Sequence, residues 1–274
     1  MTENAEIELT GTIDLHVHTS PDVKARKMDD LELARMAANQ GMRAILLKSH
    51  CTLTADRAYL VQKVVPNIKV FGGLALNLAV GGINPFAVEA ALQMGAVEIW
   101  MPTISAASEI EGGLAIFSDG HISDNVFSVL KLIAESDAIL GTGHLSSAEI
   151  STLVPAARDL GVRKILITHP EHPPVNMPPG LQEELRDRYA VLFERCLITT
   201  PFGGGHLPFG SLAQVIRRVG PETTIISTDF GQPQNPSPLE GLTYFIAHLH
   251  KHGFSYNEIN RMSRENPAHI LGLS

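Results

Sequence analysis

Cysteines, targeting signals and long apolar stretches are all scarce in this sequence. The only cysteines are Cys51 and Cys196, too few for the disulfide framework of a small secreted protein. Residues 1–10 are polar and acidic, and they lack the basic region and apolar core of a signal peptide. No apolar stretch approaches the roughly 18 residues that a membrane-spanning helix needs. We therefore expect a cytoplasmic protein with reduced thiols and no membrane partner.

Positive charge is also in short supply. The net charge is −8, and no long basic run occurs. Because nucleic-acid binding depends on Lys and Arg side chains that neutralise phosphates, we expect no nucleic-acid partner. The chain also lacks Gly-x-Gly-x-x-Gly after its first predicted strand, which disfavours a dinucleotide-binding fold.

The chain does contain a regular alternation of apolar runs and amphipathic segments. Strands are expected at residues 12–18, 43–50, 68–74, 96–101, 138–144, 164–169, 196–200 and 224–229. Helices are expected between them, one of them at 181–193, and residues 102–120 form a long loop. Strict βα alternation predicts an α/β fold with parallel strands. Because a (β/α)8 TIM barrel takes about 250 residues, we expect one such domain over residues 1–274, with extra C-terminal helices.

Polar residues collect where these strands end. His16 and His18 are two residues apart, so a strand places them on the same face. His144, His169 and Asp229 end three other predicted strands. The carboxyl ends of barrel strands build the site, and imidazole and carboxylate ligands suit transition metals. The pattern therefore predicts a metal site, whereas a lone His-x-His pair could equally be a hydrogen-bonded loop.

These residues resemble the metal-ligand set of the amidohydrolase superfamily. The resemblance rests on Asp14-Leu15-His16-Val17-His18, His144, His169 and Asp229, and residues 265–273 resemble the helix with which many members close. The first fifty residues also resemble phosphoesterases of the polymerase-and-histidinol-phosphatase type. That family closes with Asp-x-His, whereas this chain has Asp229-Phe230-Gly231.

The amidohydrolase resemblance implies a metal-dependent hydrolase with two divalent ions. His16, His18 and Asp229 would hold one ion, and His144 with His169 the other. Zinc is the first expectation, with manganese, iron or nickel as alternatives. A metal-bridged hydroxide would cleave an amide, cyclic amide, lactone or related ester of a small molecule, and Asp229 would take up its proton.

The bridge between the ions departs from the family pattern. Many binuclear members use a carbamylated lysine or a glutamate on strand four, but strand four here offers only Glu98. Lys48 instead follows the apolar run 44–47, a setting that lowers the pKa of an amine and favours its reaction with carbon dioxide. We hypothesise that Lys48 is a carbamylated bridge and metal ligand. The alternative is an unmodified Lys48 beside a single ion.

Several further residues are candidates for contact with the substrate. His50 could polarise a substrate oxygen as a catalytic residue, bind another metal, or hydrogen-bond the loop. His206, His172, Arg26, Lys24 and Arg57 could bind substrate, or could be solvated surface groups. The glycine-rich loop 203–205 could bind an anion, but no basic residue follows it, so an unusual backbone path is favoured.

Two other activities fit the same scaffold. A metal-dependent decarboxylase, which is a lyase, would need one tightly held ion and an unmodified Lys48. A phosphoesterase would follow from the second resemblance. Barrels of this kind often associate, so a homo-oligomer is expected.

Overall fold

Eight parallel strands form the centre of the molecule in the computed structural model, which describes residues 8–273. Their order in the sheet follows the chain. A bridge between Val17 and Phe230 joins the last strand to the first, so the sheet closes into the expected (β/α)8 TIM barrel. The strands are β1 (Ile13–Val17), β2 (Ala44–Leu47), β3 (Lys69–Ala75), β4 (Glu98–Trp100), β7 (Ile139–Gly141), β8 (Lys164–Thr168), β9 (Leu192–Cys196) and β10 (Thr224–Ser227).

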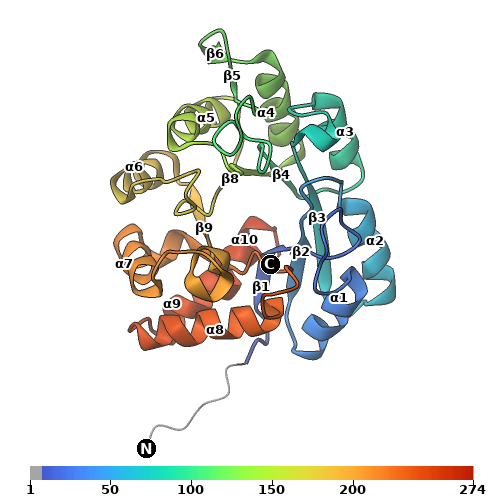
Figure 1. The fold of residues 1–274 in the computed structure, drawn as a ribbon, viewed down its shortest axis with the longest axis vertical. Helices are drawn as coiled ribbons and strands as arrows, with labels where there is room; N and C mark the ends of the chain where they lie inside the picture. Colours follow the sequence, from blue (N-terminus) through green and yellow to red (C-terminus); the bar gives the residue numbers. More distant parts are fainter. Residues whose placement is uncertain (1–7, 274) are drawn as a thin grey trace, which may run out of the picture.

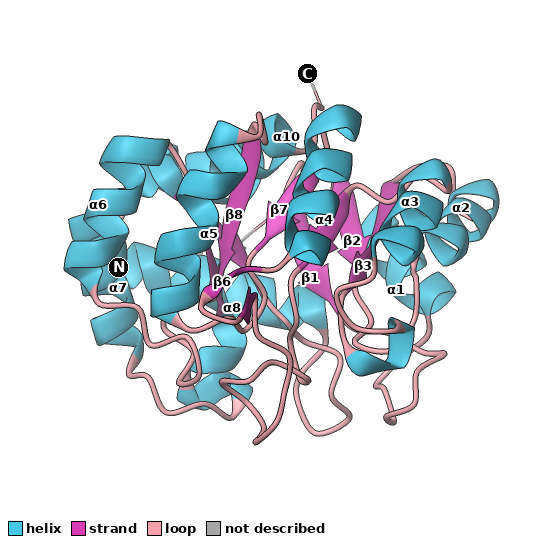
Figure 2. Ribbon diagram, turned by 90° about the horizontal axis from the view of Figure 1, so that it is seen from above, coloured by secondary structure: helices cyan, strands magenta, loops and turns pink. Residues whose placement is uncertain are grey.

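Helices surround the barrel, and long loops gather at one end of it (Figures 1 and 2). The helices are α1 (Asp30–Asn39), α2 (Ala55–Val64), α3 (Pro85–Gln93), α4 (Asp124–Ser136), α5 (Ser147–Asp159), α6 (Pro179–Tyr189), α7 (Phe209–Val219), α8 (Pro238–Lys251), α9 (Tyr256–Asn260) and α10 (Asn266–Ile270). None of those between residues 8 and 273 is long and apolar enough to cross a bilayer. Residues 1–7 lie outside the described residues. They make up most of the segment 1–10, for which we expect no signal peptide.

Apolar side chains from the strands divide between the inside and the outside of the barrel. Ile13, Leu15 and Trp100 belong to an inner cluster to which β2, β7, β8 and β10 also contribute. Ala268 and Ile270 of α10 join this cluster, which explains the extra helices at the end of the chain. The remaining apolar faces pack against the surrounding helices.

A β-bulge in β1 changes which way the first histidine points. The pairing register between β1 and β2 shifts between Asp14 and Val17. Leu15 lies in the inner cluster and Val17 in an outer one, yet His16 faces inward, with its ring centroid 6.4 Å from that of Trp100. Bulges re-aim side chains in this way near functional sites, so the bulge rather than simple alternation directs His16 into the barrel.

The seventh barrel strand and the helix before it are not where the sequence predicts them. The helix expected at 181–193 ends at Tyr189, and the strand expected at 196–200 is β9, Leu192–Cys196. Residues 197–199 form a short 3-10 helix instead. The prediction was wrong because Glu194 and Arg195 interrupt the apolar pattern, although both are fully buried. Their partners, His16 and Glu171, lie on distant segments.

Side-chain caps begin many of the helices. Capping boxes begin four helices, with the N-cap and glutamate pairs Asp29 and Glu32, Ser146 and Glu149, Ser237 and Glu240, and Ser255 and Glu258. Asn84 caps α3, and Pro85 follows it at the first helical position. Asp119 and Gly120 join β5 (Phe117–Ser118) to β6 (His121–Ile122), a small hairpin at the end of the expected long loop.

Candidate metal centre

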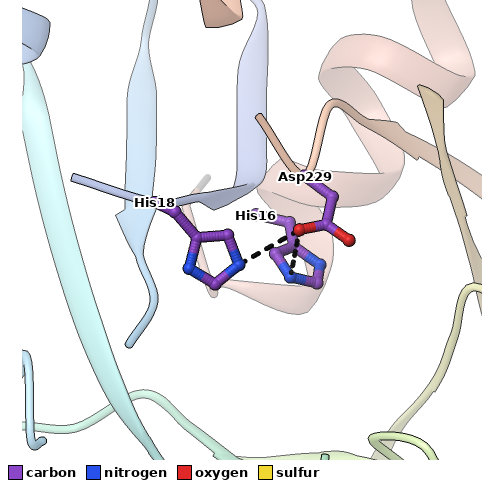
Figure 3. A group of neighbouring side chains, drawn as sticks. All are labelled: His16, His18 and Asp229. Atoms are coloured by element: carbon purple, nitrogen blue, oxygen red, sulfur yellow. Dashed lines mark ion pairs between the residues drawn. The ribbon is translucent and has the colours of Figure 1, made fainter. Parts of the chain in front are cut away.

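His16, His18 and Asp229, which we call the inner group, converge at the carboxyl ends of the first and last strands. Figure 3 shows the imidazole of His16 in β1, that of His18 directly after β1, and the carboxylate of Asp229 after β10 pointing toward one another. Oδ1 of Asp229 lies 3.2 Å from Nε2 of His16 and 3.0 Å from Nε2 of His18. The ligand atoms of all three residues lie within 4.8 Å of one another. Two nitrogens and one oxygen at this spacing could share a single cation.

The strand ends fix this geometry through hydrogen bonds. Asp14 accepts hydrogen bonds from the backbone N–H groups of His16 and Thr228, at 3.2 and 3.1 Å, and from the Thr228 hydroxyl at 2.6 Å. Asp229 N donates to His16 O at 2.8 Å. The buried Asp14 carboxylate thus ties β1 to the end of β10, directly beneath the inner group.

Glu194 fixes the orientation of His16. Nδ1 of His16 lies 3.1 Å from Oε2 of Glu194, and both side chains are 1% exposed. Because a carboxylate accepts hydrogen bonds, Glu194 favours a hydrogen on Nδ1 of His16, and Nε2 is the ring nitrogen that faces Asp229. A carboxylate behind a histidine is the usual arrangement at metal sites.

The hydrogen bonding and the pKa values of the inner group fit a bound metal ion. Nε2 of His18 makes no hydrogen bond to any described residue, although Asp229 Oδ1 is close by. Burial lowers the pKa of His18 to about 4, so its imidazole is neutral and able to bind a metal. Against the effect of burial, His16 and His18 hold the pKa of Asp229 well below its usual range. Two imidazoles beside a carboxylate are a suitable donor set for zinc and related ions.

Lys48 lies directly beside the inner group. Its Nζ is 3.0 Å from Nε2 of His16 and 4.9 Å from the centre of the Trp100 ring. The side chain is buried, which lowers the pKa of its amine. Within residues 8–273, no carboxylate lies at ion-pair distance from Nζ.

A second set of candidate ligands, Glu109, His144 and His172, forms the outer group. Oε1 of Glu109 contacts Nδ1 of His144 and lies 3.3 Å from Nε2 of His172. The ligand atoms again lie within 4.8 Å of one another. His169, which was expected to pair with His144, lies between the two groups: its ring centroid is 4.8 Å from that of His144 and 6.0 Å from that of His16.

His50 lies beside both groups and belongs to a polar network. Its ring stacks on His18 with centroids 4.8 Å apart, and its Nδ1 lies 2.8 Å from the hydroxyl of Thr103. Asn77 donates hydrogen bonds to His50 O and to the Thr103 hydroxyl. Burial is the main cause that lowers the pKa of His50 well below its usual value, so the ring is neutral.

A cavity of about 490 Å³ opens above these groups. Polar and histidine residues make up much of its lining: His50, His144, His169, Glu171, His172, Thr199, His206, Asp229, Gln232, Gln234 and Asn235. Within the described chain, no lysine or arginine lines it. A Cβ at Gly205 would lie 2.1 Å from Thr199 O, so the backbone passes too close there for any residue but glycine. His206 follows it in the chain, is exposed and lines the cavity.

The predicted basic residues lie around this cavity rather than in it. Arg26 pairs with Asp22 at 2.7 Å, and its Nη2 lies 3.4 Å from Nδ1 of His18. Arg57 is held by Asp30 and by the carbonyl groups of Thr19 and Pro21, so it fastens the loop after β1. Lys24 is exposed in that same loop.

Sequence reasoning missed Glu109 and Glu194. Glu109 lies nine residues beyond the end of β4 in an irregular loop, and only its proximity to two histidines reveals it. Glu194 lay in what was expected to be the join between a helix and a strand. A charged residue within a short apolar run was the one available signal for it.

Comparisons with known proteins support the fold. A family model described as a family of unknown function (DUF6282) matches residues 11–194, and no curated protein matches the chain. An amidohydrolase structure from Pseudomonas aeruginosa has 14% identity and a TM-score of 0.65, covering 96% of this chain and 95% of that one. A dihydroorotase structure has 14% identity and a TM-score of 0.66, covering 97% and 70%. A mutant organophosphorus hydrolase from Deinococcus radiodurans has 15% identity and a TM-score of 0.60, covering 97% and 94%. The chain thus has the fold of the amidohydrolase superfamily.

Proposed function

This chain belongs to the DUF6282 family, and we propose that it is a metal-dependent hydrolase of small molecules. The observation that carries the proposal is the inner group, whose two imidazoles and one carboxylate bring their ligand atoms within 4.8 Å of one another beside a cavity of about 490 Å³. The solved structures of the same fold include an amidohydrolase, a dihydroorotase and an organophosphorus hydrolase. Their names agree with hydrolysis as the reaction class.

The ligands on both sides of the mouth suit divalent ions, with zinc as our first choice. His16, His18 and Asp229 would hold one ion, and His144 and His169 contribute to a second. Such ions lower the pKa of a water molecule toward neutrality and polarise the oxygen of the bond to be cleaved.

Asp229 is the residue that we assign to proton transfer. Its Oδ1 faces both imidazoles of the inner group, and Figure 3 shows its other oxygen pointing away from them. Asp229 also lines the cavity. Its carboxylate would accept the proton of the attacking water and return it to the leaving group.

The lining of the cavity favours a neutral substrate over an anionic one. Gln232, Gln234 and Asn235 supply amide donors and acceptors, His206 stands at the rim, and His50 faces the site. A phosphate or carboxylate group usually needs an arginine or lysine partner, and none lines the cavity within the described chain. We therefore favour an amide, cyclic amide or lactone over a phosphoester or a decarboxylation substrate.

Lys48 remains our candidate for the bridge between the ions. Its buried amine lies 3.0 Å from His16 Nε2, with no carboxylate of the described chain at ion-pair distance. A neutral amine in such a place can react with carbon dioxide to give a carbamate, whose two oxygens suit a shared position between cations.

The test is metal removal followed by a substrate panel. Purified protein is stripped by chelation, reloaded with zinc, manganese, iron or nickel, and assayed on cyclic amides, lactones, linear amides, phosphoesters and carboxylic acids. We expect activity on the first two classes only after reloading. Full activity after exhaustive chelation would overturn the proposal. Turnover confined to phosphoesters or to decarboxylation would replace it with one of those two activities.

A further inference from the structure

We propose that the outer group is a cation site of its own, in which Glu109 and His172 are metal ligands together with His144. This site deepens the proposed function and rests on it, because it supplies a complete ligand set for the second ion. It also assigns a role to the long loop after β4, which would be fastened to the barrel through the metal.

The geometry brings three separate loops to one point. Glu109 comes from the loop after β4, His144 from the end of β7 and His172 from the loop after β8. A single oxygen of Glu109, Oε1, faces both imidazoles, through Nδ1 of His144 and Nε2 of His172. All three ligand atoms fall within 4.8 Å of one another. Two nitrogens and a carboxylate oxygen form the ligand set of many catalytic zinc sites.

His169 provides an independent sign of a missing ligand. It is 1% exposed, and its Nδ1 has no hydrogen-bond partner in the described part of the chain. Its ring centroid lies 4.7 Å from that of His172 and 4.8 Å from that of His144. A buried polar atom without a partner is costly, so the unpartnered Nδ1 of His169 points to a ligand bound beside the outer group.

The local backbone holds these residues in place. His172 N donates to His169 O at 2.8 Å, so a tight turn sets the two imidazoles side by side. Glu109 N donates to Ala106 O at 2.9 Å, and the Ser108 hydroxyl contacts His144 O. The loop therefore lies against the end of β7, and this contact places the Glu109 carboxylate beside His144.

The site is open on the side that a substrate would use. His144, His169 and His172 all line the cavity, and Glu109 and His172 have side-chain exposures of 24% and 30%. A cation held by three protein ligands keeps a coordination position for water or substrate. The alternative is a hydrogen-bonded triad in which Glu109 only orients the two histidines.

Titration of the metal-free protein with Co²⁺, followed by visible absorption and metal analysis, separates these alternatives. We expect the wild type to bind two equivalents, and Glu109→Gln and His172→Gln to bind one each. Glu111→Gln and His121→Gln, which alter exposed residues of the same segment, are matched controls and should bind two. Two equivalents in both Glu109→Gln and His172→Gln would overturn the proposal.

A second measurement tests the fastening of the loop. Metal loading should slow proteolytic cleavage within residues 107–113 of the wild type, and this protection should be lost in Glu109→Gln. His18→Gln should lose the inner equivalent and keep the outer one. If the wild type binds one equivalent and His18→Gln binds none, the outer site is refuted while the proposed hydrolase is not. If no cation binds at the inner group, the proposed function fails first.

Discussion

The inner and outer groups offer similar donor atoms but are built in different ways. The inner group stands at the ends of β1 and β10, with His16 and His18 at 1% side-chain exposure. The outer group takes one ligand, His144, from the end of β7, and the other two, Glu109 and His172, from loops where they are partly exposed. Strand ends place ligands before any metal arrives, whereas a ligand on a loop must be ordered when the metal binds. We therefore expect tighter cation binding at the inner group.

Removal of the proton acceptor should have the largest effect. Asp229→Asn keeps an oxygen ligand and suits the left-handed backbone at this position, but it cannot carry a proton. Turnover should fall by about 10²–10⁴-fold, with a nearly unchanged KM and metal content, measured by steady-state kinetics and metal analysis. Turnover near that of the wild type would refute this role for Asp229.

Substitution of Lys48 tests the proposed bridge between the two ions. Lys48→Met retains the apolar stem and removes the amine, so we expect bound metal to fall from two ions per chain to one or none. Intact mass of the wild type should show an added carboxyl group that acid treatment removes. Two ions in Lys48→Met would show that the outer group binds its ion without a lysine bridge.

Substitution of Glu194 tests whether its buried contact with His16 strengthens metal binding at the inner group. Glu194→Gln should weaken the inner ion by roughly 10–100-fold, because the neutral amide polarises His16 less than the carboxylate does. Competition with a chelator dye measures this change. Glu184→Gln, at an exposed position, is the control. Equal losses of affinity at both groups would contradict a role confined to His16.

The smallest effect is expected for Glu98→Gln, which should alter how the stability of the folded protein depends on pH. Burial, assisted by the charge of Glu194, raises the pKa of Glu98 well above its usual value. The folded protein therefore binds this proton more tightly than the unfolded chain, and stability falls as pH rises from the unfolded pKa to the folded one. In metal-free protein, Glu98→Gln should melt at a higher temperature than the wild type at about pH 8, with the difference shrinking toward about pH 4.5. A difference independent of pH would exclude this cause.

The sequence predicted the inner group better than the outer one, for a physical reason. The closed barrel places a ligand that ends a strand at the mouth, so the sequence positions of His16, His18 and Asp229 were enough to bring them together. Glu109 depends on the path of an irregular loop, which no periodicity describes. The β-bulge between Asp14 and Val17 was not predicted either, because it is a feature of the pairing of β1 with β2.

The fold was predictable wherever local signals and burial agreed. Eight apolar runs with helical segments between them predicted the barrel and the order of its strands. β9 was misplaced because Glu194 and Arg195 are charged residues buried by distant partners. These ion pairs join segments that are far apart in the sequence, so the local apolar pattern cannot predict them.

Two of the residues at the mouth, His169 and Asp229, have positive φ values of +25° and +57°. Non-glycine residues in this backbone region cost of order 1–3 kcal/mol each, so the barrel gives up stability to aim these two side chains. Glycine at either position would relieve that strain. A single glycine substitution at His169 or Asp229 should therefore give a more heat-resistant but inactive barrel. Random selection for thermostability alone should favour changes at these two positions.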